Sequence, residues 1–365
     1  MVVSYKHKDT CFRLSVLEIA NLNLRRKISN SLLEFFQGFE KMSNGKDALE
    51  FLFTDNIDLF VVDQDFVRIK DIRIGSTQTY FHDNELNFLV NHTNPYKIIV
   101  NVEDNDTFLS SVRVFNKAFK TNIDLQITTF YYRIFLLFSQ LWNLENKCSY
   151  IHAASVEKNN RAILFSADSG VGKSSLLLQL SLNKGYKFIA DDLTILSQDG
   201  EAFFQGRSIS IKPYHLKFYD FLLDKINMSC MQKLQWRIVR DNRLTFRIPP
   251  KKIFSDISNG CKINRVIHLC NSTKQEFMIK DINASELIKY TIPILTNEFF
   301  LANNNLDKLS SLPGSYFVST NKIYTDSKEI FSNAFKKVDI KLVFVPYKSS
   351  PVELFNFLNR EGCLD

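Results

Sequence analysis

Residues 161–178 read RAILFSADSGVGKSSLLL, and this stretch is the most informative about the fold. Residues 161–166 are apolar and suit a strand, residues 167–174 form a small, glycine-containing loop, and Lys173 opens an apolar helix. This order fits the pattern GxxxxGK[ST], in which backbone N–H groups and a helix N-terminus surround phosphate. The sequence therefore predicts a phosphate-binding loop.

The loop carries Ala167 where the pattern has its first glycine. Because alanine is the smallest replacement, we expect the loop to keep its shape. Lys173 is expected to reach the β- and γ-phosphates and Ser174 to ligate Mg²⁺, so the expected cofactors are Mg²⁺ and ATP or another nucleoside triphosphate. The alternative is a glycine-rich turn with an incidental lysine. The residues expected to bind nucleotide are Ser169, Gly170, Val171, Gly172, Lys173, Ser174 and Ser175.

A second expected strand, residues 149–156, precedes the loop strand after a short polar turn. So short a connection makes the two strands antiparallel. Pairing Val156 with Arg161 would place His152 opposite Phe165, at the mouth of the loop. A lone histidine in a strand is usually structural, but this position predicts that His152 acts on a neighbouring carboxylate or phosphate. The other five histidines lack such a context and are treated as structural.

Asp191 and Asp192 end the strand expected at residues 186–190, after the loop helix. If this strand is a parallel neighbour of the loop strand, both carboxylates lie beside the phosphates. One could hold Mg²⁺ and the other could accept the proton of an attacking hydroxyl, the alternative being an aspartate that only caps a turn. The transferring phosphoryl group also needs cations. Four downstream candidates, each of which could instead be a solvated surface group, are Arg207, Lys212, Arg243 and Arg247.

The length of 365 residues and the alternating strands and helices predict an α/β protein of two domains. We expect an N-terminal α+β domain at residues 1–115, with an accessory or substrate-binding role, and a catalytic domain at residues 116–365. A core-facing helix is expected at residues 124–146, where Ile127, Phe130, Ile134, Leu137, Leu141 and Leu144 share one face. Further strands are expected at residues 59–62, 97–102, 203–211, 265–269 and 340–345, and further helices at residues 32–36, 214–226, 284–289 and from residue 351.

The net charge of +7 is spread along the chain without a basic run, so a nucleic-acid partner is not expected. The most apolar stretch, residues 134–138, is too short to span a membrane, which needs about 20 residues. The six cysteines are scattered and have no zinc-site spacing, which is typical of reduced thiols in the cytoplasm. The sequence leaves open whether the chain forms a homo-oligomer.

Four motifs in this order resemble the catalytic domain of HPr kinase/phosphorylase, and more closely its relatives found beside peptide-modification genes. They are residues 151–154 (IHAA), 168–175 (DSGVGKSS), 185–186 (GY) and 190–192 (ADD), so the resemblance covers only a small part of the chain. It implies the phosphoenolpyruvate-carboxykinase-like P-loop fold, a mixed sheet with flanking helices. It also implies a kinase that moves the γ-phosphoryl group of ATP to a serine hydroxyl on a peptide or small protein.

Carried over residue by residue, the resemblance makes Lys173 and Ser174 the phosphate and Mg²⁺ ligands. Asp191 becomes the base on the acceptor serine, assisted by His152, and Asp192 joins the metal site. No E-I-R-G run follows Asp192, so phosphorylase activity is not expected, and the N-terminal region gives no match that would imply HPr as the substrate. Relatives in lasso-peptide clusters phosphorylate a serine of a precursor peptide. A kinase for a small-metabolite hydroxyl and a non-catalytic nucleotide-binding regulator are the alternatives.

Overall fold

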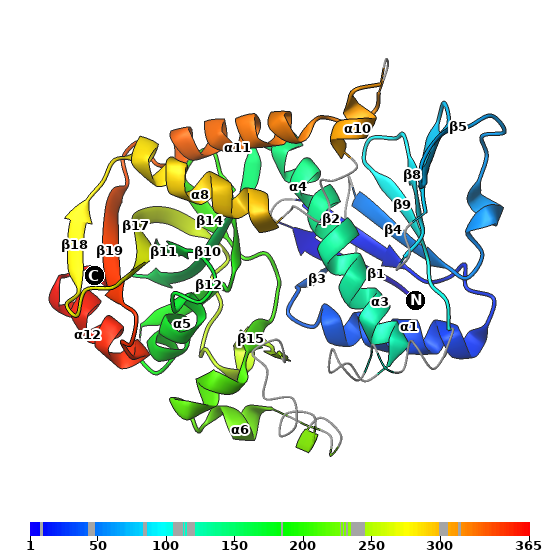
Figure 1. Ribbon diagram of the computed structural model, residues 1–365. Coiled ribbons are helices and arrows are strands. Elements are labelled where there is room, and N and C mark those ends of the chain that lie inside the picture. The colour runs from blue at the N-terminus through cyan, green and yellow to red at the C-terminus, as the bar shows by residue number, and fades with distance from the viewer. Residues whose placement is uncertain are drawn as a thin grey trace. The chain divides into compact units, whose positions relative to one another are not determined.

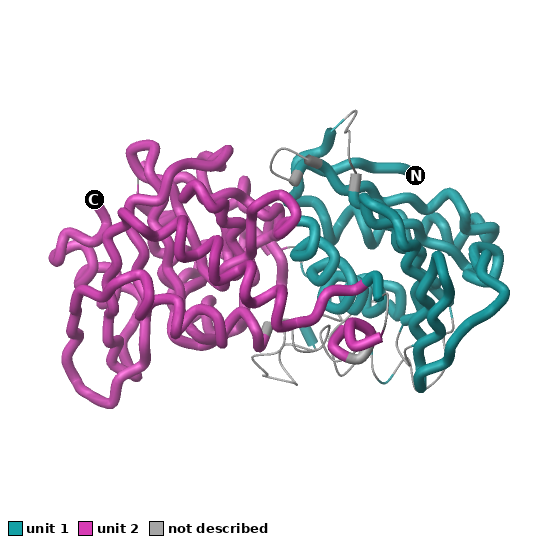
Figure 2. Tube along the Cα trace, turned by 90° about the horizontal axis from the view of Figure 1, so that it is seen from above, with its two compact units in different colours: residues 1–142, 228–240, 313–316 teal, residues 143–227, 241–312, 317–365 magenta. Residues whose placement is uncertain are grey.

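The protein is a mixed α/β chain with two large mixed sheets, and its contacts divide it into two compact units (Figure 2). Unit 1 comprises residues 1–142, 228–240 and 313–316, and unit 2 comprises residues 143–227, 241–312 and 317–365. The chain passes from one unit to the other later than the expected boundary at residue 115. The computed structural model describes residues 1–7, 10–42, 48–82, 86–104, 112, 114, 121–183, 185–226, 228, 230, 233–234, 245–298, 306–312 and 315–365.

Unit 1 is built on a nine-stranded sheet in the order β3-β1-β2-β4-β9-β8-β7-β6-β5. The pairs β2–β4 and β4–β9 are parallel and the others are antiparallel. Its elements are β1 (Val2–His7), β2 (Thr10–Ser15), α1 (Leu22–Phe35), β3 (Lys41–Met42), β4 (Ala48–Thr54), η1 (Ile57–Phe60), β5 (Val67–Ile69), β6 (Ile72–Ile74), β7 (Gln78–Phe81), β8 (Phe88–Asn91), β9 (Lys97–Asn101), α3 (Asn122–Phe130), η2 (Tyr131–Phe135) and the start of α4 (Leu136–Glu145).

The core of unit 1 is aromatic. Phe36, which caps α1, lies 5.7 Å from Phe12 of β2 and 5.4 Å from Phe135, measured between ring centroids. Phe130 of α3 lies edge-on to Phe51 of β4 at 5.1 Å. Aromatic pairs at these separations add to the gain from burying their area. The many phenylalanines of the N-terminal third therefore fasten α1 and α3 to one sheet.

Two sequence predictions in unit 1 have different outcomes. The long helix expected at residues 124–146 is confirmed as α3, one π-helical turn (η2) and α4 in succession, and its predicted apolar face is buried except for Leu144, which is half-buried. The strand expected at residues 59–62 is wrong. That segment is the end of the 3₁₀ helix η1 and an irregular stretch, with Leu59 and Val62 both exposed, because a four-residue apolar run does not by itself distinguish a strand.

Unit 2 carries the predicted phosphate loop and holds the remaining elements (Figure 1). These are β10 (Cys148–Lys158), β11 (Arg161–Ala167), α5 (Lys173–Ser181), β12 (Tyr186–Ala190), β13 (Leu193–Ser197), β14 (Glu201–Phe203), β15 (Ile209–Ile211), η3 (Pro213–Lys217), α6 (Leu222–Lys225), β16 (Phe246–Ile248), η4 (Pro250–Lys252), β17 (Cys261–Ser272), β18 (Met278–Asp281), α8 (Ala284–Glu298), α10 (Leu306–Ser310), α11 (Thr320–Ala334), β19 (Asp339–Pro346) and α12 (Pro351–Arg360).

The sheet of unit 2 follows the order β11-β10-β13-β14-β17-β19-β18, and β17 also pairs with β11. The loop strand β11 is antiparallel to β10 on one side and parallel to β17 on the other. β12 and β13 both pair antiparallel with β10, one after the other along its length. The region expected as one strand at residues 203–211 is two, β14 and β15, and β15 pairs with β16 in a separate two-stranded ribbon.

Helices cover both faces of this sheet (Figure 1). α5 contacts β10, β11, β12 and the C-terminal helix α12, whereas α8 and α11 contact β10 from the other face. Leu176, Leu177 and Leu178 of α5 are all fully buried, as expected of a helix that is apolar on every side. The phosphate loop thus leads into a helix that is enclosed by core, which fixes the position of its N-terminus.

The hairpin before the loop has a tighter turn than the sequence predicted. β10 continues to Lys158, which pairs with Arg161, and the turn consists of Asn159 and Asn160 alone, with φ of 51° and 59°. Two successive residues at positive φ are characteristic of a type I′ turn, which matches the twist of a two-residue hairpin and favours asparagine. The register is therefore shifted by two residues from the predicted pairing of Val156 with Arg161.

All six cysteines carry free thiols, in agreement with their scattered positions. Within the described residues, no helix combines the length and the apolar character needed to cross a bilayer.

The hairpin turn gives a stability prediction. Replacing Asn159 and Asn160 together by alanine should lower the free energy of unfolding by about 2–4 kcal/mol, because each of the two alanines would have to adopt a left-handed conformation that costs roughly 1–2 kcal/mol. Asn160→Gly should leave the stability unchanged or slightly higher, since Asn-Gly suits this turn. Urea unfolding measures both, and an unaltered midpoint for the alanine pair would show that the turn is not formed this way.

Candidate active site

The loop between β11 and α5 has the backbone shape of an anion cradle. Gly170 and Gly172 adopt φ of 86° and 114°, a region that residues with a side chain rarely enter. A Cβ built on either glycine meets no atom within 4 Å, so the requirement is one of backbone conformation rather than of space. Gly172 caps α5 without any side-chain hydrogen bond, which leaves first-turn N–H groups able to bind an anion.

Ala167, which replaces the first glycine of the pattern, fits because it is still part of a regular strand. It is the last residue of β11 and is buried in the core that surrounds α5. Only its carbonyl oxygen, which accepts a hydrogen bond from Lys173, takes part in the loop. The expectation that alanine leaves the loop shape intact is therefore met.

The Lys173 side chain folds back over the start of the loop and binds its backbone. Its side chain is nearly fully buried, and Nζ donates to the carbonyl oxygens of Ala167 at 2.8 Å and Asp168 at 3.1 Å. The ammonium group is thus held at the point where β11 ends and the cradle begins.

Two further hydrogen bonds fix the backbone on either side of Lys173. The Asp168 carboxylate accepts from the N–H of Ser169 at 2.7 Å. Farther along the helix, the carbonyl of Ser175 accepts from the hydroxyl of Tyr219 at 2.8 Å.

Asp191 is the carboxylate that contacts the loop helix. One oxygen, Oδ1, accepts from the Ser174 hydroxyl at 2.8 Å, and the other, Oδ2, accepts from the backbone N–H of Ser210 at 3.1 Å. The residue is buried. Burial, and then the charge of Asp192, raise the pKa of Asp191, against the opposing effects of these hydrogen bonds and of Arg207.

Asp192 is held by two basic side chains. His152 Nε2 lies 3.1 Å from Oδ1, and Nη1 of Arg207 donates to Oδ2. Both partners are buried, whereas about a third of the Asp192 side chain (32%) is exposed. Burial alone would raise the pKa of Asp192, but the Arg207 charge and the His152 contact outweigh it and hold that pKa well below its usual range. Asp192 is therefore an ionised, partly accessible carboxylate.

Asp192 is the central residue of a strained turn that begins at Asp191. The N–H of Leu193 donates to the carbonyl of Asp191 at 3.0 Å, and Asp192 between them has φ of 78°. A hydrogen bond two residues apart around a residue at this φ defines the rare form of the γ-turn, and a non-glycine residue there is strained. The turn interrupts what would otherwise be one strand, β12 and β13, along β10.

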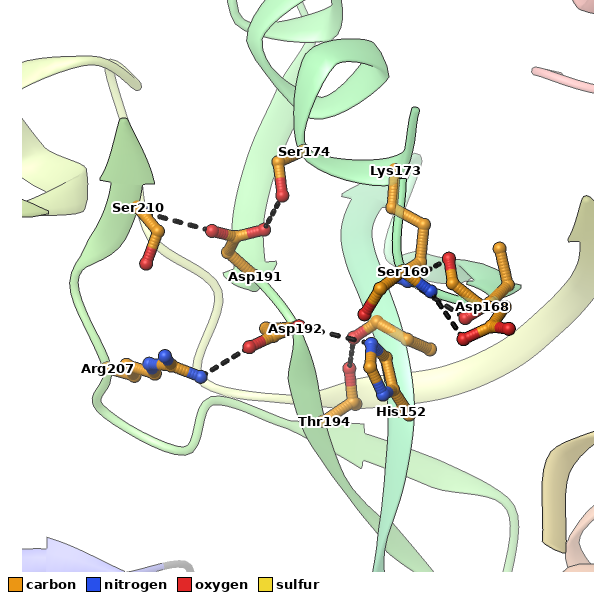
Figure 3. A network of polar contacts seen from close by, with 12 residues as sticks. His152, Asp168, Ser169, Lys173, Ser174, Asp191, Asp192, Thr194, Arg207 and Ser210 are labelled. Atoms are coloured by element: carbon orange, nitrogen blue, oxygen red, sulfur yellow. Dashed lines mark hydrogen bonds and ion pairs between the residues drawn. The ribbon is translucent and has the colours of Figure 1, made fainter. Parts of the chain in front are cut away.

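Each of the two carboxylates is bound on two sides, and the Oδ1 and Oδ2 atoms of both face the same two sides. Both Oδ1 atoms bind side chains of the loop helix and β10, namely Ser174 and His152, and both Oδ2 atoms bind the segment of residues 207–210. Figure 3 shows this division, with Lys173 on one side of the carboxylate pair and Arg207 and Ser210 on the other. The aspartates thus lie between the phosphate loop and the polypeptide that follows Arg207.

Two details of the predicted geometry require correction. His152 does not lie opposite Phe165, which pairs with Ala154, but pairs with Leu193 of β13. Because the register shift is two residues, the His152 side chain points to the same face of the sheet as predicted. It still lies near the end of β11 where the phosphate loop begins. In addition, β12 is not a direct neighbour of the loop strand, because β10 lies between them. The two strands nevertheless run in the same direction, so Asp191 still reaches Ser174.

The four downstream cations differ in position. Arg207 is bound to Asp192 rather than placed over the loop. Lys212 follows β15 directly, and Arg247 lies in β16 directly opposite Ser210. Arg243 lies outside the described residues. The contact of the Ser210 N–H with Asp191 was not predicted, although the alternation Ser208-Ile209-Ser210-Ile211 is typical of a strand with one polar face.

A histidine treated as structural, His268, lies close to the loop strand. It occupies β17 directly beside Ser166, and its ring stacks on Tyr290 at 5.0 Å. Burial, and then the charge of Lys173, lower the pKa of His268 to about 4. The ring is therefore neutral near pH 7, and its packing on Tyr290 supports the structural interpretation.

The oxygen donors here suit magnesium. Among the described residues, no group of three or more His, Cys, Asp or Glu side chains could hold a metal ion by itself. Mg²⁺ commonly uses one or two carboxylates together with substrate phosphates, and the hydroxyl of Ser174 beside the Asp191 carboxylate provides a donor set of this kind. These residues therefore fit a magnesium ion that arrives with a nucleotide.

No protein-family model matches the chain, and no curated protein matches it in sequence. Among solved structures, the chain is similar to the HPr(Ser) kinase/phosphatase from Coxiella burnetii, with 10% sequence identity and a TM-score of 0.27. The similar region covers 59% of this chain and 91% of that one. At this identity and TM-score the similarity carries no functional argument.

The Arg207–Asp192 ion pair gives a pH-dependent prediction. Since the folded-state pKa of Asp192 is depressed, its stabilising contribution is complete above the unfolded-state pKa near 4 and is lost as the pH falls through the folded-state value. Arg207→Gln should therefore reduce stability by about 1–3 kcal/mol at pH 7 and by less as the pH falls below about 4. Denaturant titrations at several pH values measure this difference.

Two variants control this experiment. Arg161→Gln removes an exposed arginine and should have little effect at any pH. Asp192→Asn combined with Arg207→Gln should recover part of the lost stability, because the uncompensated carboxylate is removed with its partner. An Arg207→Gln defect that does not change with pH would contradict the ion-pair explanation.

Proposed function

We propose that this protein is an ATP- and Mg²⁺-dependent kinase that transfers the γ-phosphoryl group to a serine-type hydroxyl of a peptide or small protein. The observation that carries the proposal is the pair of adjacent aspartates, one bound to the loop serine and the other to a buried histidine and arginine. A loop that only binds nucleotide needs the aspartate beside its serine but has no need of the second aspartate. A second, partly exposed carboxylate next to it provides what an acceptor hydroxyl needs.

The loop side would bind the nucleotide. Lys173 and the N–H groups around Gly170 and Gly172 would hold the phosphate oxygens, and Lys173 would exchange its contacts with two loop carbonyls for contacts with phosphate. Ser174 and Asp191 would hold Mg²⁺, which neutralises the charge that develops on the phosphoryl oxygens. The mixed sheet with helices on both faces is compatible with the phosphoenolpyruvate-carboxykinase-like P-loop fold that the motifs imply.

The contacts favour an exchange of the two aspartate roles that the motif resemblance implies. Ser174, the expected Mg²⁺ ligand, binds Asp191, and His152, the expected assistant of the base, binds Asp192. We therefore assign Asp191 to the metal side and Asp192 to the acceptor side. His152 and Arg207 would be positioning residues that fix the Asp192 carboxylate without touching the substrate.

In the transfer step, the acceptor oxygen would attack the γ-phosphorus in line with the leaving oxygen of ADP. The bond from the acceptor oxygen to phosphorus forms, the bond between the γ-phosphorus and the bridging oxygen breaks, and the hydroxyl proton passes to Asp192. A low pKa does not prevent this, because phosphoryl transfer has a loose transition state, and the hydroxyl proton becomes acidic as the oxygen bonds to phosphorus. Asp192 would mainly orient the hydroxyl and receive its proton late.

The peptide or protein nature of the acceptor is supported by the motif resemblance to kinases found beside peptide-modification genes. A precursor peptide of the lasso type is one acceptor in this class. Incubation with γ-labelled ATP and serine peptides tests the proposal directly. Label on serine supports it, label in a small soluble compound identifies a metabolite kinase, and tight ATP binding without any transfer identifies a regulator.

The first functional prediction concerns nucleotide binding. Lys173→Met should abolish the increase in melting temperature that ATP and Mg²⁺ produce, because the ammonium group at the end of β11 is lost. Lys217→Met changes an exposed lysine of unit 2 and should keep the full increase. A normal ATP-dependent increase in the Lys173 variant, with an intact circular dichroism spectrum, would overturn the assignment of the loop.

The second functional prediction separates the two aspartates. Asp191→Asn should remove the Mg²⁺ dependence of ATP affinity, whereas Asp192→Asn should bind ATP with Mg²⁺ normally and lose about 10²–10⁴-fold in transfer rate. Isothermal titration with and without Mg²⁺ and single-turnover transfer measure the two effects. The opposite result, with Mg²⁺ dependence lost in the Asp192 variant only, would restore the roles implied by the motifs.

A further inference from the structure

The ribbon of β15 and β16 presents one face to the core and the other away from it. Ile209, Ile211 and Ile248 are buried in the core that surrounds α5. Side chains alternate along a strand, so Ser210 and Arg247 lie on the opposite face, and they are directly paired across the ribbon. Direct cross-strand partners lie about 5 Å apart at Cβ, which places the Arg247 side chain next to Ser210.

This outer face adjoins the carboxylate pair on the side away from the phosphate loop. The N–H of Ser210 binds Asp191 Oδ2, and Arg207, shortly before β15, binds Asp192 Oδ2. The loop helix and β10 hold the two Oδ1 atoms through Ser174 and His152. The close-up shows the same separation, with the carboxylates between the 207–210 segment and Lys173 (Figure 3).

Positive charge gathers on this face. Arg247 is half-buried opposite Ser210, and Lys212 follows β15 in extended backbone with φ of −110° and ψ of 160°. An extended residue two positions after Ser210 continues the same face. His215 adds no charge near pH 7, because burial and then the Lys212 charge lower its pKa to about 4. The face therefore combines two cations with the polar backbone that contacts Asp191.

Tyr214 supports the proximity of this segment to the aspartates. Burial first, and then the charges of Asp191 and Asp192, raise the pKa of its phenol. Charges act on a titratable group in this way only when they lie close to it, so η3 as well as the ribbon lies near the carboxylate pair. An acceptor that reached Asp192 from this side would pass along these residues.

The two ends of an in-line transfer enter from opposite directions, since the attacking and leaving oxygens lie on opposite sides of phosphorus. The loop occupies the nucleotide side, so the ribbon faces the acceptor side. We propose that the outer face of the β15–β16 ribbon, through Arg247 and Lys212, binds an acidic side chain that flanks the acceptor hydroxyl. Guanidinium fits a carboxylate through two parallel hydrogen bonds, which gives orientation as well as attraction. This inference rests on the proposed kinase function.

The test uses end-blocked serine peptides that differ in one flanking position, which is Asp, Asn or Lys. Single-turnover transfer and fluorescence-polarisation binding in ADP and Mg²⁺ are measured with the full chain. The Asp peptide should exceed the Asn peptide by about tenfold in kcat/KM and in affinity, a free-energy difference of about 1.4 kcal/mol, and the Lys peptide should be worst. Arg247→Ala and Lys212→Ala should each shrink this preference and leave ATP affinity within about twofold.

Two further variants complete the design. Lys217→Ala removes a more distant, exposed lysine and should keep the preference for Asp. Arg247→Glu should reverse it in favour of the Lys peptide, a gain that a misfolded protein cannot produce. Equal binding of the three peptides by the unaltered chain, or a loss of ATP affinity in the Arg247 and Lys212 variants, would overturn the inference.

The binding measurement also separates this inference from the kinase proposal. Charge-dependent peptide binding without any transfer would contradict the kinase activity while supporting the cationic docking face. Transfer to serine with no dependence on the flanking charge would support the kinase and contradict the docking face.

Discussion

The turn at Asp191 and Asp192 is the constraint on which the rest of the site depends. Two neighbouring carboxylates repel each other. Burial, and then the charge of Asp192, raise the pKa of Asp191, whereas Arg207 and His152 outweigh burial and hold the pKa of Asp192 low. The positive φ of Asp192 and the tight hydrogen bond across the turn give the two side chains separate sets of partners. Strain of this kind persists only where the surroundings hold it, and here Ser174, Ser210, His152 and Arg207 all do so.

The sheet explains why these partners meet. β10 is long enough to pair with β11 on one side and with β12 and then β13 on the other, so it brings the end of the loop strand and the aspartate turn to the same place. His152 lies on β10 between them. α5 is enclosed by core, so Ser174 cannot move far from Asp191. Because Ser174 and Asp191 are already in contact, a kinase with this site would need little rearrangement of its catalytic groups. The nucleotide would bind at the N-terminus of α5.

The sequence predicted which residues gather at this site better than it predicted their contacts. Glycines, lysine and serine at fixed spacing depend only on local backbone shape, so the loop at Gly170 to Ser174 could be predicted in detail. The same holds for the helix at residues 124–146, whose apolar period continues through a π-helical turn. The turn at Asn159 and Asn160 could not be placed, because four polar residues allow several registers, and only the full sheet selects one.

The partners of the aspartates depend on contacts between distant segments, which no local pattern reveals. The ribbon at Ser210 and Arg247 joins residues separated by a long intervening stretch of chain. By sequence alone, Arg247 was therefore only one candidate cation among four. Arg207 was predicted as a candidate phosphate contact, and in the structure it forms an ion pair with Asp192. Side-chain type and local spacing therefore indicated which residues come together, and tertiary pairing decided which aspartate faces which partner.

Whether the protein is a serine kinase is decided by mass spectrometry of a serine peptide incubated with the full chain, ATP and Mg²⁺, alongside quantification of ADP. We expect phosphoserine and ADP to appear in equal amounts, and we expect both to require the peptide. ADP released at the same rate with no peptide present, and no phosphate on serine, would contradict it, because the exposed carboxylate of Asp192 would then serve water rather than an acceptor hydroxyl.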